Sequence, residues 1–464
     1  MTKVQLTAVA AVMAATVASG RPVPRPALAE RMENGPNIIG IVHWGLNTYS
    51  DREWGYGDED PKTLAPSAFD ADQIVSACRD GGIGGLVVVA KHHDGFCLWP
   101  TKTTGHNISK SPFRNGKGDY VKEMEQACRK AGIRFGVYVS PWDRNAPDYG
   151  SQSYVEKYHA QIKELLSGDY GEVFEMWFDG ANGGNGWYGG AKEIRKIPDG
   201  YYRFDEVFAF VRALQPKVCI FAGESDDSDF RWPGNERGML DPESRATIET
   251  VGGFANGKYG NPNYKGQINT GSPNGAFFRV CEADFPMRPG WFYHAKDKGR
   301  TKNAAFLMQR YLTSVGNGGT MNIGIAPNRD GRLDEEDVNA LRGFGALRKA
   351  YFSSPVKAGK ANLAVLREDI SKGERISSWK IVSGDAVLAS GKVIGCGRIR
   401  ALANATDVAG ITLKTEGGEV KSAEYYNVDP ELVALVANAT AEGGETDTAK
   451  WMTGAAKEPA SSRK

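Results

Sequence analysis

Residues 172–181 contain the side chains whose types and order most directly suggest chemistry. Residues 173–178 form a short apolar run that predicts a buried strand, and Asp179 follows this run before a Gly-Ala pair. A carboxylate at the C-terminal end of a buried strand lies where α/β barrels place their reactive groups. The neighbouring Trp177 and Phe178 would keep it partly dry, so its charge would act strongly on a developing cation. The alternative is that Asp179 caps the next helix.

Several other predicted strands also end in polar or aromatic side chains. These side chains are His43, His92, His93, Tyr138, Trp142 and Trp177, in addition to Asp179. Because strand ends share one mouth in a barrel, we expect these groups to face a common pocket. Imidazoles, a phenol and carboxylates can hydrogen-bond hydroxyl groups, while indole rings pack on the apolar face of a pyranose. The set therefore suits a sugar.

Metal binding is the competing interpretation for the adjacent His92 and His93. Neighbouring residues on a strand point to opposite faces, so both rarely bind one ion. The sequence also lacks the H-x-x-x-H and H-E-x-x-H patterns. We therefore predict no metal and no cofactor. For either histidine alone, a satisfied position in the core remains the alternative.

The elements that would position these residues alternate along the chain. The predicted strands cover residues 38–42, 85–90, 133–138, 173–178, 217–221 and 319–324. The predicted helices cover residues 27–32, 70–80, 119–131, 154–166, 204–214, 302–315 and 335–350. Apolar strands alternating with helices indicate β/α units and a parallel sheet, and the recurring polar strand ends favour a closed (β/α)8-like barrel. Residues 222–299, rich in Gly, Asn, Asp and Pro, are expected to be mostly loop.

The length of 464 residues, of which 41% are hydrophobic, is ample for a barrel and a smaller domain. Short strand-like runs split by Gly and Asp follow the barrel and predict a β-sandwich. The predicted organisation is a signal peptide at 1–20, a catalytic barrel at 21–350, a β-sandwich domain at 351–438 and a flexible polar tail at 439–464.

Composition narrows the partners and the location. Lys and Arg total 57 against 56 Asp and Glu, without a long basic run, which argues against nucleic acid. Lys3 precedes an apolar run at 4–18, which predicts a secretory signal and a secreted or periplasmic protein; an amphipathic or disordered leader is the alternative. No other stretch is apolar enough to span a bilayer. The six cysteines lack C-x-x-C spacing, so buried free thiols are expected.

The sequence resembles the α-L-fucosidases of glycoside hydrolase family 29 over residues 25–350. The matching motifs are HWGLNTY (43–49), REW (52–54), KHHDGF (91–96), VYVSPWD (137–143), EMWFDGA (175–181), RWPGNE (231–236) and RPGWFYH (288–294). The resemblance implies a (β/α)8-like barrel followed by a β-sandwich, and a retaining exo-glycosidase that acts on fucosylated oligosaccharides or glycoconjugates.

By this resemblance Asp179 is the nucleophile and Glu236 is the acid/base. The motif Arg-Trp-x-Gly-Asn-Glu is similar to that of the branch that prefers fucose α-1,3- or α-1,4-linked to N-acetylglucosamine in Lewis-type glycans. Fucose contacts are implied for His43, Glu53, Trp54, His92, His93, Tyr138, Trp177, Arg231 and Trp291.

Retention requires two carboxyl groups roughly 5–5.5 Å apart with pKa values pushed apart. Asp179 is expected to stay ionised beside donors such as Tyr138, while Glu236 beside Trp232 would hold a proton. The stretch 223–232 is longer than the family's usual spacing, and it contains Glu224, a rival acid.

Several alternatives stay open. Glu282 is a third candidate acid. A broad-specificity α-L-fucosidase, an enzyme acting on another sugar, and a non-catalytic fucose- or glycan-binding barrel are the other functions compatible with the sequence. The oligomeric state is left open as well.

Overall fold

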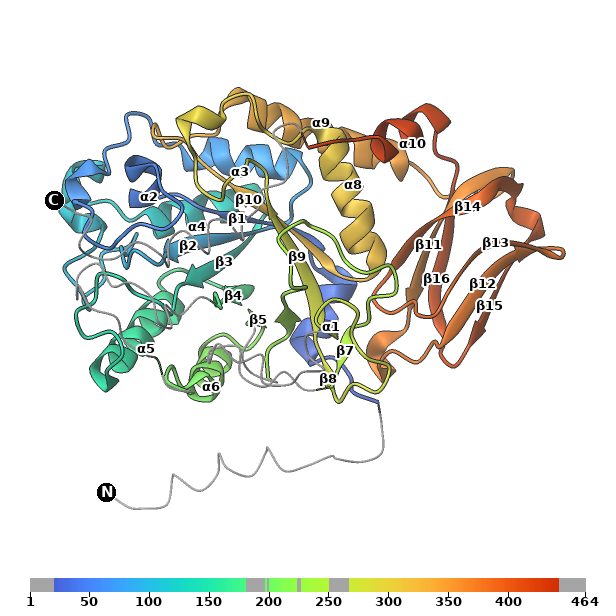
Figure 1. The fold of residues 1–464 in the computed structure, drawn as a ribbon, viewed down its shortest axis with the longest axis horizontal. Helices are drawn as coiled ribbons and strands as arrows, with labels where there is room; N and C mark the ends of the chain where they lie inside the picture. The colour runs from blue at the N-terminus through green and yellow to red at the C-terminus, as the bar shows by residue number, and fades with distance from the viewer. Residues whose placement is uncertain (1–20, 181–196, 198–199, 223–226, 250–266, 442–464) are drawn as a thin grey trace, which may run out of the picture.

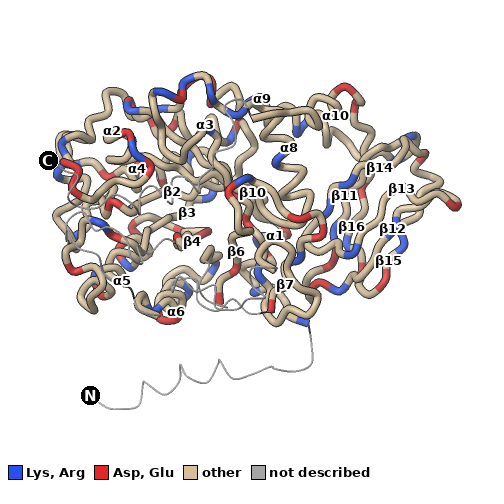
Figure 2. Tube along the Cα trace, in the orientation of Figure 1, with Lys and Arg blue, Asp and Glu red and all other residues tan. Residues whose placement is uncertain are grey.

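The computed structural model describes residues 21–180, 197, 200–222, 227–249 and 267–441. The predicted signal peptide and most of the predicted tail lie outside these residues. The described chain forms a barrel ringed by helices, with a second, all-β unit beside it (Figure 1). Lys and Arg are interspersed with Asp and Glu along the described part of the trace (Figure 2).

Eight parallel strands of the described chain close into a barrel, in the spatial order β1-β10-β9-β6-β5-β4-β3-β2. These strands are β1 (Ile38–Val42), β2 (Gly85–Lys91), β3 (Arg134–Val139), β4 (Glu175–Trp177), β5 (Cys219–Phe221), β6 (Phe230–Arg231), β9 (Val280–Pro286) and β10 (Thr320–Ile325). Their apolar runs follow from burial on both faces, by the barrel interior and by the helices outside. The predicted fold class is confirmed, and six of these strands were predicted to within two residues.

Residues 222–299, predicted to be mostly loop, also contain two strands of the barrel that the sequence analysis did not predict. This segment contains the barrel strands β6 and β9, and also a small antiparallel pair, β7 (Thr247–Ile248) with β8 (Phe277–Phe278). Every residue of β9 is buried. The strand does not read as an apolar run because Glu282 and Asp284 alternate with its apolar residues, and both carboxyl groups are buried.

Helices follow most of the barrel strands and cover the outside of the barrel (Figure 1). They are α2 (Leu46–Ser50), α3 (Ala71–Asp80), α4 (Tyr120–Ala131), α5 (Gln152–Leu166), α6 (Phe204–Leu214), α8 (Ala304–Ser314) and α9 (Glu335–Tyr351). Capping explains several of their ends. Asp70 and Asp119 accept the backbone N–H of the residue three positions on, each at 2.9 Å. Gly132 ends α4 in the left-handed region, at φ +71°.

Helix α1 (Pro26–Asn34) precedes β1, and its Arg31 enters the floor of the barrel. The guanidinium donates to Glu175 Oε2 at 3.1 Å, and both side chains are at most 2% exposed. Glu282 lies beside them; burial, then its charge, raises the pKa of Glu175 well above the usual range. The floor therefore contains one cation and two carboxyl groups, of which one is neutralised by a proton.

The second unit contains two three-stranded antiparallel sheets, in the orders β14-β11-β16 and β13-β12-β15. Its strands are β11 (Lys360–Glu368), β12 (Ser378–Ser383), β13 (Ala386–Gly391), β14 (Arg398–Asp407), β15 (Ile411–Glu416) and β16 (Val420–Tyr426). Trp379, Ile381 and Leu366 pack between the sheets as its core. Helix α10 (Pro430–Ala437) then returns to the barrel, where Gln309 of α8 donates to the carbonyl oxygen of Val436 at 3.2 Å.

The second unit holds one barrel loop through main-chain contacts. Glu374 accepts the backbone N–H of Ala246 at 2.9 Å, and Arg398 donates to the carbonyl oxygen of Ser244. Glu374 and Arg398 are both at most 3% exposed. The loop after β6 is therefore fixed from outside the barrel.

The six cysteines are free thiols, and five of them are buried, as predicted. Within the described ranges, no helix has the length and apolar character needed to cross a membrane.

Replacing Arg31 with Met should lower the free energy of unfolding by about 3–5 kcal/mol at neutral pH, because two buried carboxyl groups lose their cation. A raised carboxyl pKa in the folded state costs stability as pH rises from the unfolded pKa to the folded one. The deficit of the variant should therefore shrink at mildly acidic pH. Urea unfolding followed by tryptophan fluorescence at the two pH values measures this.

The matched control is Arg79→Met, which breaks a surface pair with Asp80 where the arginine side chain is 52% exposed. It should change the free energy of unfolding by less than about 1 kcal/mol at either pH. An Arg31→Met deficit that does not depend on pH would show that charge neutralisation is not what Arg31 supplies.

Candidate active site

The C-terminal ends of β1, β2, β3 and β4 bring most of the predicted residues together. The rings of His43 and His92 are 5.7 Å apart, and those of His92 and His93 are 4.2 Å apart. Tyr138 stacks on His92 at 5.9 Å and on Trp177 at 5.4 Å. These side chains form one continuous cluster at the mouth of the barrel.

Asp179, two residues beyond β4, reaches this cluster with a side chain that is 26% exposed. The Tyr138 hydroxyl donates a hydrogen bond to Asp179 Oδ2 at 3.1 Å. Burial and the Asp179 charge raise the pKa of Tyr138 well above its usual range, so the phenol keeps its proton. Asp179 is thus a partly exposed carboxylate oriented by a permanent donor.

The neighbours of His93 determine which of its ring nitrogens bears the proton. Its Nδ1 lies 2.7 Å from Ser140 Oγ, and the Ser140 hydroxyl donates to the carbonyl oxygen of Trp142 at 2.8 Å. The serine oxygen must therefore accept the proton of Nδ1. Burial, followed by the charge of Arg144, lowers the pKa of His93 well below its usual range, so the ring is neutral. Its Nε2 then presents a lone pair, 4.0 Å from Asp179 Oδ2.

His92 has the opposite tautomer. The Asn47 amide nitrogen lies 3.2 Å from His92 Nδ1, while Asn47 Oδ1 accepts the backbone N–H of Gly55 at 3.1 Å. Nδ1 therefore accepts, and burial together with His93 and His43 lowers the pKa of His92 so that the ring is neutral. Its Nε2 must bear the proton and act as a donor. Adjacent histidines thus offer one donor and one acceptor.

His43 completes the set of neutral rings. Burial lowers its pKa to about 3. A site with three neutral imidazoles does not gain charge near neutral pH, so these rings can hydrogen-bond hydroxyl groups without attracting anions.

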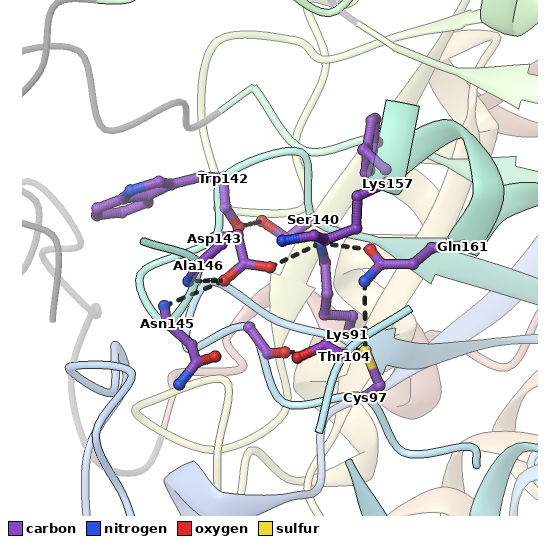
Figure 3. Close-up of polar contacts among 12 residues, drawn as sticks. Lys91, Cys97, Thr104, Ser140, Trp142, Asp143, Asn145, Ala146, Lys157 and Gln161 are labelled. Carbon is purple, nitrogen blue, oxygen red and sulfur yellow. Dashed lines mark hydrogen bonds and ion pairs between the residues drawn. The ribbon is translucent and has the colours of Figure 1, made fainter. Parts of the chain in front are cut away.

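A buried polar network beneath β2 and β3 positions these rings (Figure 3). Lys91 Nζ is fully buried and donates to Gln161 Oε1 at 2.9 Å, and pairs with Asp143 Oδ2 at 3.3 Å. Asp143 in turn accepts the backbone N–H of Ala146 at 2.8 Å. The indole of Trp142, next to Asp143, points away from the network (Figure 3). Lys91 and Asp143 therefore tie together the loops that bear His92, His93 and Trp142.

Glu236 is half-buried and lies on the loop after β6. Trp291 Nε1 donates to Glu236 Oε2 at 3.1 Å, and the Trp291 ring lies 5.1 Å from that of His43. Gly324 permits this placement, because a Cβ there would come within 2.7 Å of the indole. Glu236 is thereby joined to the same cluster as Asp179.

Glu53 holds the loop that bears Trp291. Its Oε2 accepts the backbone N–H of Trp291 at 2.9 Å, and its Oε1 accepts that of Phe292 at 3.2 Å. His294 Nε2 lies 2.6 Å from Oε1, and hydrogen bonds and charge from Glu53 and Asp51 outweigh burial and raise the pKa of His294. Glu53 is 8% exposed. Its carboxylate therefore positions Trp291, in addition to bordering the cluster.

Indole rings form one wall and the base of the cluster. Trp54 meets Trp142 edge to face at 5.5 Å and His93 at 5.4 Å. Trp177 stacks on Phe221 at 4.0 Å, and its Nε1 donates to Glu282 at 3.0 Å. The wall is therefore apolar and the base is rigid.

Arg231 lies outside the cluster. Its guanidinium is fully buried and is directed at main-chain carbonyl oxygens, including those of Ile268 at 3.0 Å and Arg245 at 2.6 Å. This side chain supports the loops behind Trp232 and Glu236.

Glu224 and Glu282 were the two alternative candidates for the catalytic acid. Glu224 falls outside the described residues. Glu282 is fully buried at the barrel floor, where Trp177, Asn322 and Thr320 donate to its oxygens. A carboxyl group held in this way is not presented to a substrate.

Sequence reasoning missed three residues that shape the site. Asn47 and Ser140 lie inside matched motifs, but their effect on the histidine tautomers depends on contacts between strands. Asp284 was missed together with β9, although the alternation Glu-Ala-Asp in an otherwise apolar run is a signal of a barrel strand facing a polar interior.

The arrangement can bind a small, uncharged, hydroxyl-rich ring. Neutral donors and acceptors alternate around it, and indoles offer an apolar face. One carboxylate, Asp179, lies just beyond β4, and one further carboxyl group, Glu236, lies on the loop after β6, two strands away in the barrel. Two carboxyl groups beside a sugar-binding site are the groups that glycoside hydrolysis requires.

Comparisons with known proteins agree with this geometry. The sequence profile described as alpha-L-fucosidase matches residues 28–351. Putative alpha-L-fucosidase 1 of Oryza sativa subsp. japonica is 36% identical over 381 residues, covering 78% of this chain and 68% of that protein. Alpha-L-fucosidase 1 of Arabidopsis thaliana is 37% identical over 342 residues, covering 73% of this chain and 62% of that protein, which is less than two thirds of its length.

A crystal structure of a glycoside hydrolase 29 family member from an unknown rumen bacterium superposes with a TM-score of 0.80 at 33% identity. The alignment covers 88% of this chain and 78% of that one. With its barrel, its paired carboxyl groups and a profile match over most of its length, the chain belongs to the alpha-L-fucosidase family, glycoside hydrolase family 29.

Proposed function

We propose that this protein is a retaining exo-α-L-fucosidase that removes terminal α-1,3- or α-1,4-linked fucose from Lewis-type glycans. The observation that supports this most directly is that an oriented carboxylate and a second carboxyl group both contact one neutral, hydroxyl-binding cluster. Asp179 accepts from Tyr138 at 3.1 Å, and Glu236 accepts from Trp291 at 3.1 Å.

In the first step an Asp179 oxygen attacks the anomeric carbon of fucose while the bond from that carbon to the leaving oxygen breaks. Glu236 gives its proton to the leaving oxygen, and a covalent fucosyl ester forms on Asp179. The lone pair of His93 and the Nε2–H of His92 hold fucose hydroxyl groups. These contacts accelerate the step to the extent that they tighten in the oxocarbenium-like transition state.

In the second step water attacks the same carbon and the ester bond to Asp179 breaks. Glu236, now ionised, takes the proton of the water and returns to its acid form. Fucose leaves and Asp179 regains its charge. The two carboxyl groups and one water molecule are the only reactants that these steps use besides the fucoside.

The linkage preference is supported by the sequence RWPGNE at 231–236. A preference for these linkages would come from contacts between the aglycone and the exposed side of the Glu236 loop. A broad-specificity fucosidase would lack this preference. The proposed secreted or periplasmic location is supported by the sequence of residues 1–20.

Replacing Asp179 with Ala should reduce activity on every α-L-fucoside by at least ~10³-fold, because the variant lacks the carboxylate that forms the ester. The measurement is fucose release from an aryl fucoside and from a Lewis trisaccharide. Fucose binding by calorimetry should survive, which separates lost chemistry from lost folding. A variant that retains activity would remove Asp179 from the mechanism.

Replacing Glu236 with Ala should slow cleavage of natural glycans by about 10²–10⁴-fold, because their leaving groups need a proton. Aryl fucosides with acidic leaving groups should be far less affected in their kcat/KM. Arg237→Ala, on the same loop and exposed, is the matched control and should leave both rates intact. Equal losses on the two substrate classes would argue against Glu236 as the acid.

The linkage is tested by comparing Lewis-type trisaccharides (α-1,3/1,4) with 2′-fucosyllactose (α-1,2). Fucose release from the Lewis sugars alone is the expected result. Comparable release from 2′-fucosyllactose would leave the nucleophile in place and refute the linkage preference. Binding without release by the wild-type protein would indicate a non-catalytic glycan-binding barrel.

A further inference from the structure

His294 differs from the three neutral histidines of the mouth, because both of its ring nitrogens lie beside carboxylates. Its Nδ1 is 2.8 Å from Asp51 Oδ1, and its Nε2 is 2.6 Å from Glu53 Oε1. An ionised carboxylate only accepts hydrogen bonds, so each ring nitrogen must bear a proton. Burial acts to lower the pKa of His294, but hydrogen bonds and charge from Glu53 and Asp51 outweigh it and raise the pKa. The ring is therefore an imidazolium held between two carboxylates.

The segment that bears both carboxylates is itself fixed. Asp51 ends α2 in the left-handed region at φ +59°, a conformation that aspartate adopts more readily than most residues. The Asn47 amide donates to the carbonyl oxygen of Glu53 at 3.1 Å. Glu53 and His294 are both buried. The bridge from Asp51 through His294 to Glu53 is therefore a built part of the fold, unlike a pair of charges on the surface.

Glu53 fixes the main chain beside the catalytic cluster. Its carboxylate accepts the backbone N–H groups of Trp291 and Phe292, at 2.9 and 3.2 Å, in addition to the imidazolium. Gly290 allows this approach, since a Cβ at that position would overlap Glu53 Oε1. The Phe292 ring then packs edge to face on His43 at 5.2 Å. A carboxylate with three donors keeps one orientation, and so does the backbone bound to it.

The Trp291 indole extends this fixed position to Glu236. Its Nε1–H donates to Glu236 Oε2 at 3.1 Å, and its ring lies against His43 and over Gly324. An indole N–H can only donate, and a protonated carboxyl group accepts more readily at its carbonyl oxygen than at its hydroxyl oxygen. When Glu236 is in its acid form, the proton is therefore on Oε1.

We propose that His294 is a positioning residue for the catalytic acid, Glu236. It acts through Glu53 and Trp291, whose indole N–H leaves Oε1 as the oxygen that gives its proton to the leaving group. This role rests on the proposed function of Glu236 as the acid. A glutamate on a half-buried loop has many orientations, and the proton is transferred only from those in which it meets the leaving oxygen. The indole selects one orientation, and the imidazolium keeps the indole in place.

The first test measures how the rate depends on the leaving group. In a series of aryl fucosides, the slope of log kcat/KM against leaving-group pKa reports how much proton donation assists bond cleavage. In His294→Ala the slope should be steeper. Activity on a Lewis trisaccharide should fall about tenfold, while the aryl fucoside with the most acidic leaving group should lose less than about threefold. Equal losses along the series would overturn the proposal, because general damage to the site lowers every rate alike.

A double-mutant cycle tests whether the effect passes through the indole. Trp291→Phe keeps an aromatic ring and removes the N–H, so it should steepen the same slope. Adding His294→Ala to Trp291→Phe should change the slope little further, because the hydrogen bond that His294 maintains is already absent. Additive effects of the two substitutions would show that His294 does not act through Trp291, and the proposal would fall.

The matched control is His159→Ala. His159 is 6% exposed, packs on Phe210 of α6 and hydrogen-bonds the carbonyl oxygen of Tyr202 at 2.9 Å. This variant removes a similarly buried imidazole from the outside of the barrel, so the slope should stay as in the wild type even where the melting temperature falls. A steeper slope in His159→Ala would count against the proposal, because the slope would then follow stability.

A further measurement needs no substrate. In protein labelled with 5-fluorotryptophan, the fluorine resonance of Trp291 is the one missing from Trp291→Phe. It should shift in Glu236→Gln and in His294→Ala, and stay in place in His159→Ala. An unchanged resonance in His294→Ala would overturn the proposal even if activity falls. A wild-type protein that releases no fucose would refute the proposed function, while this spectrum would still decide whether His294 positions the indole.

Discussion

Carboxyl groups enclosed in a closed barrel must each be neutralised by a cation, a proton or several donors, and this requirement shapes the protein from floor to mouth. At the floor, Arg31 and a proton serve Glu175 and Glu282 together. One layer higher, burial, followed by the charge of Glu236, raises the pKa of Asp284 well above its usual range, and no cation among the described residues pairs with it. Asp179 reaches the mouth, where its side chain is 26% exposed and accepts a hydrogen bond from the Tyr138 hydroxyl. Among these groups, the carboxyl group of Asp179 is therefore the one that a substrate can reach.

The three histidines of the cluster are neutral for a related reason, because burial makes a charged imidazole unfavourable. A protonated imidazole beside Asp179 would pair with it and reduce its reactivity, but burial and the cations Lys91 and Arg144 keep His93 neutral. The fully buried Lys91 is itself held by Asp143, so its charge is compensated away from the mouth. The pocket can therefore recognise hydroxyl groups by hydrogen bonding, while Asp179 supplies a negative charge beside them.

Sequence alone was sufficient for the barrel, for six of its strands and for most of the cluster, because apolar strands ending in polar residues are a local pattern. The sequence did not predict β9, because its inward-facing residues Glu282 and Asp284 interrupt the apolar run. Arg231 shows the converse: its motif predicts a sugar contact, but its direction depends on loops folded around it. Likewise, no local signal tells which nitrogen of His92 or His93 bears the proton, since Asn47 and Ser140 decide this across strands.

The main chain at Ala246 is shared by the two units of the protein. Its N–H is bound by Glu374 of the β-sheet unit, while its carbonyl oxygen is bound by Arg231 of the barrel. The carbonyl oxygen of Ser244, two residues earlier, is bound by Arg398. Exchange of the β-sheet unit with that of a distant relative would therefore alter the support of the Glu236 loop unless both contact surfaces changed together. The β-sheet unit is therefore part of the support of this loop, which the barrel does not hold alone.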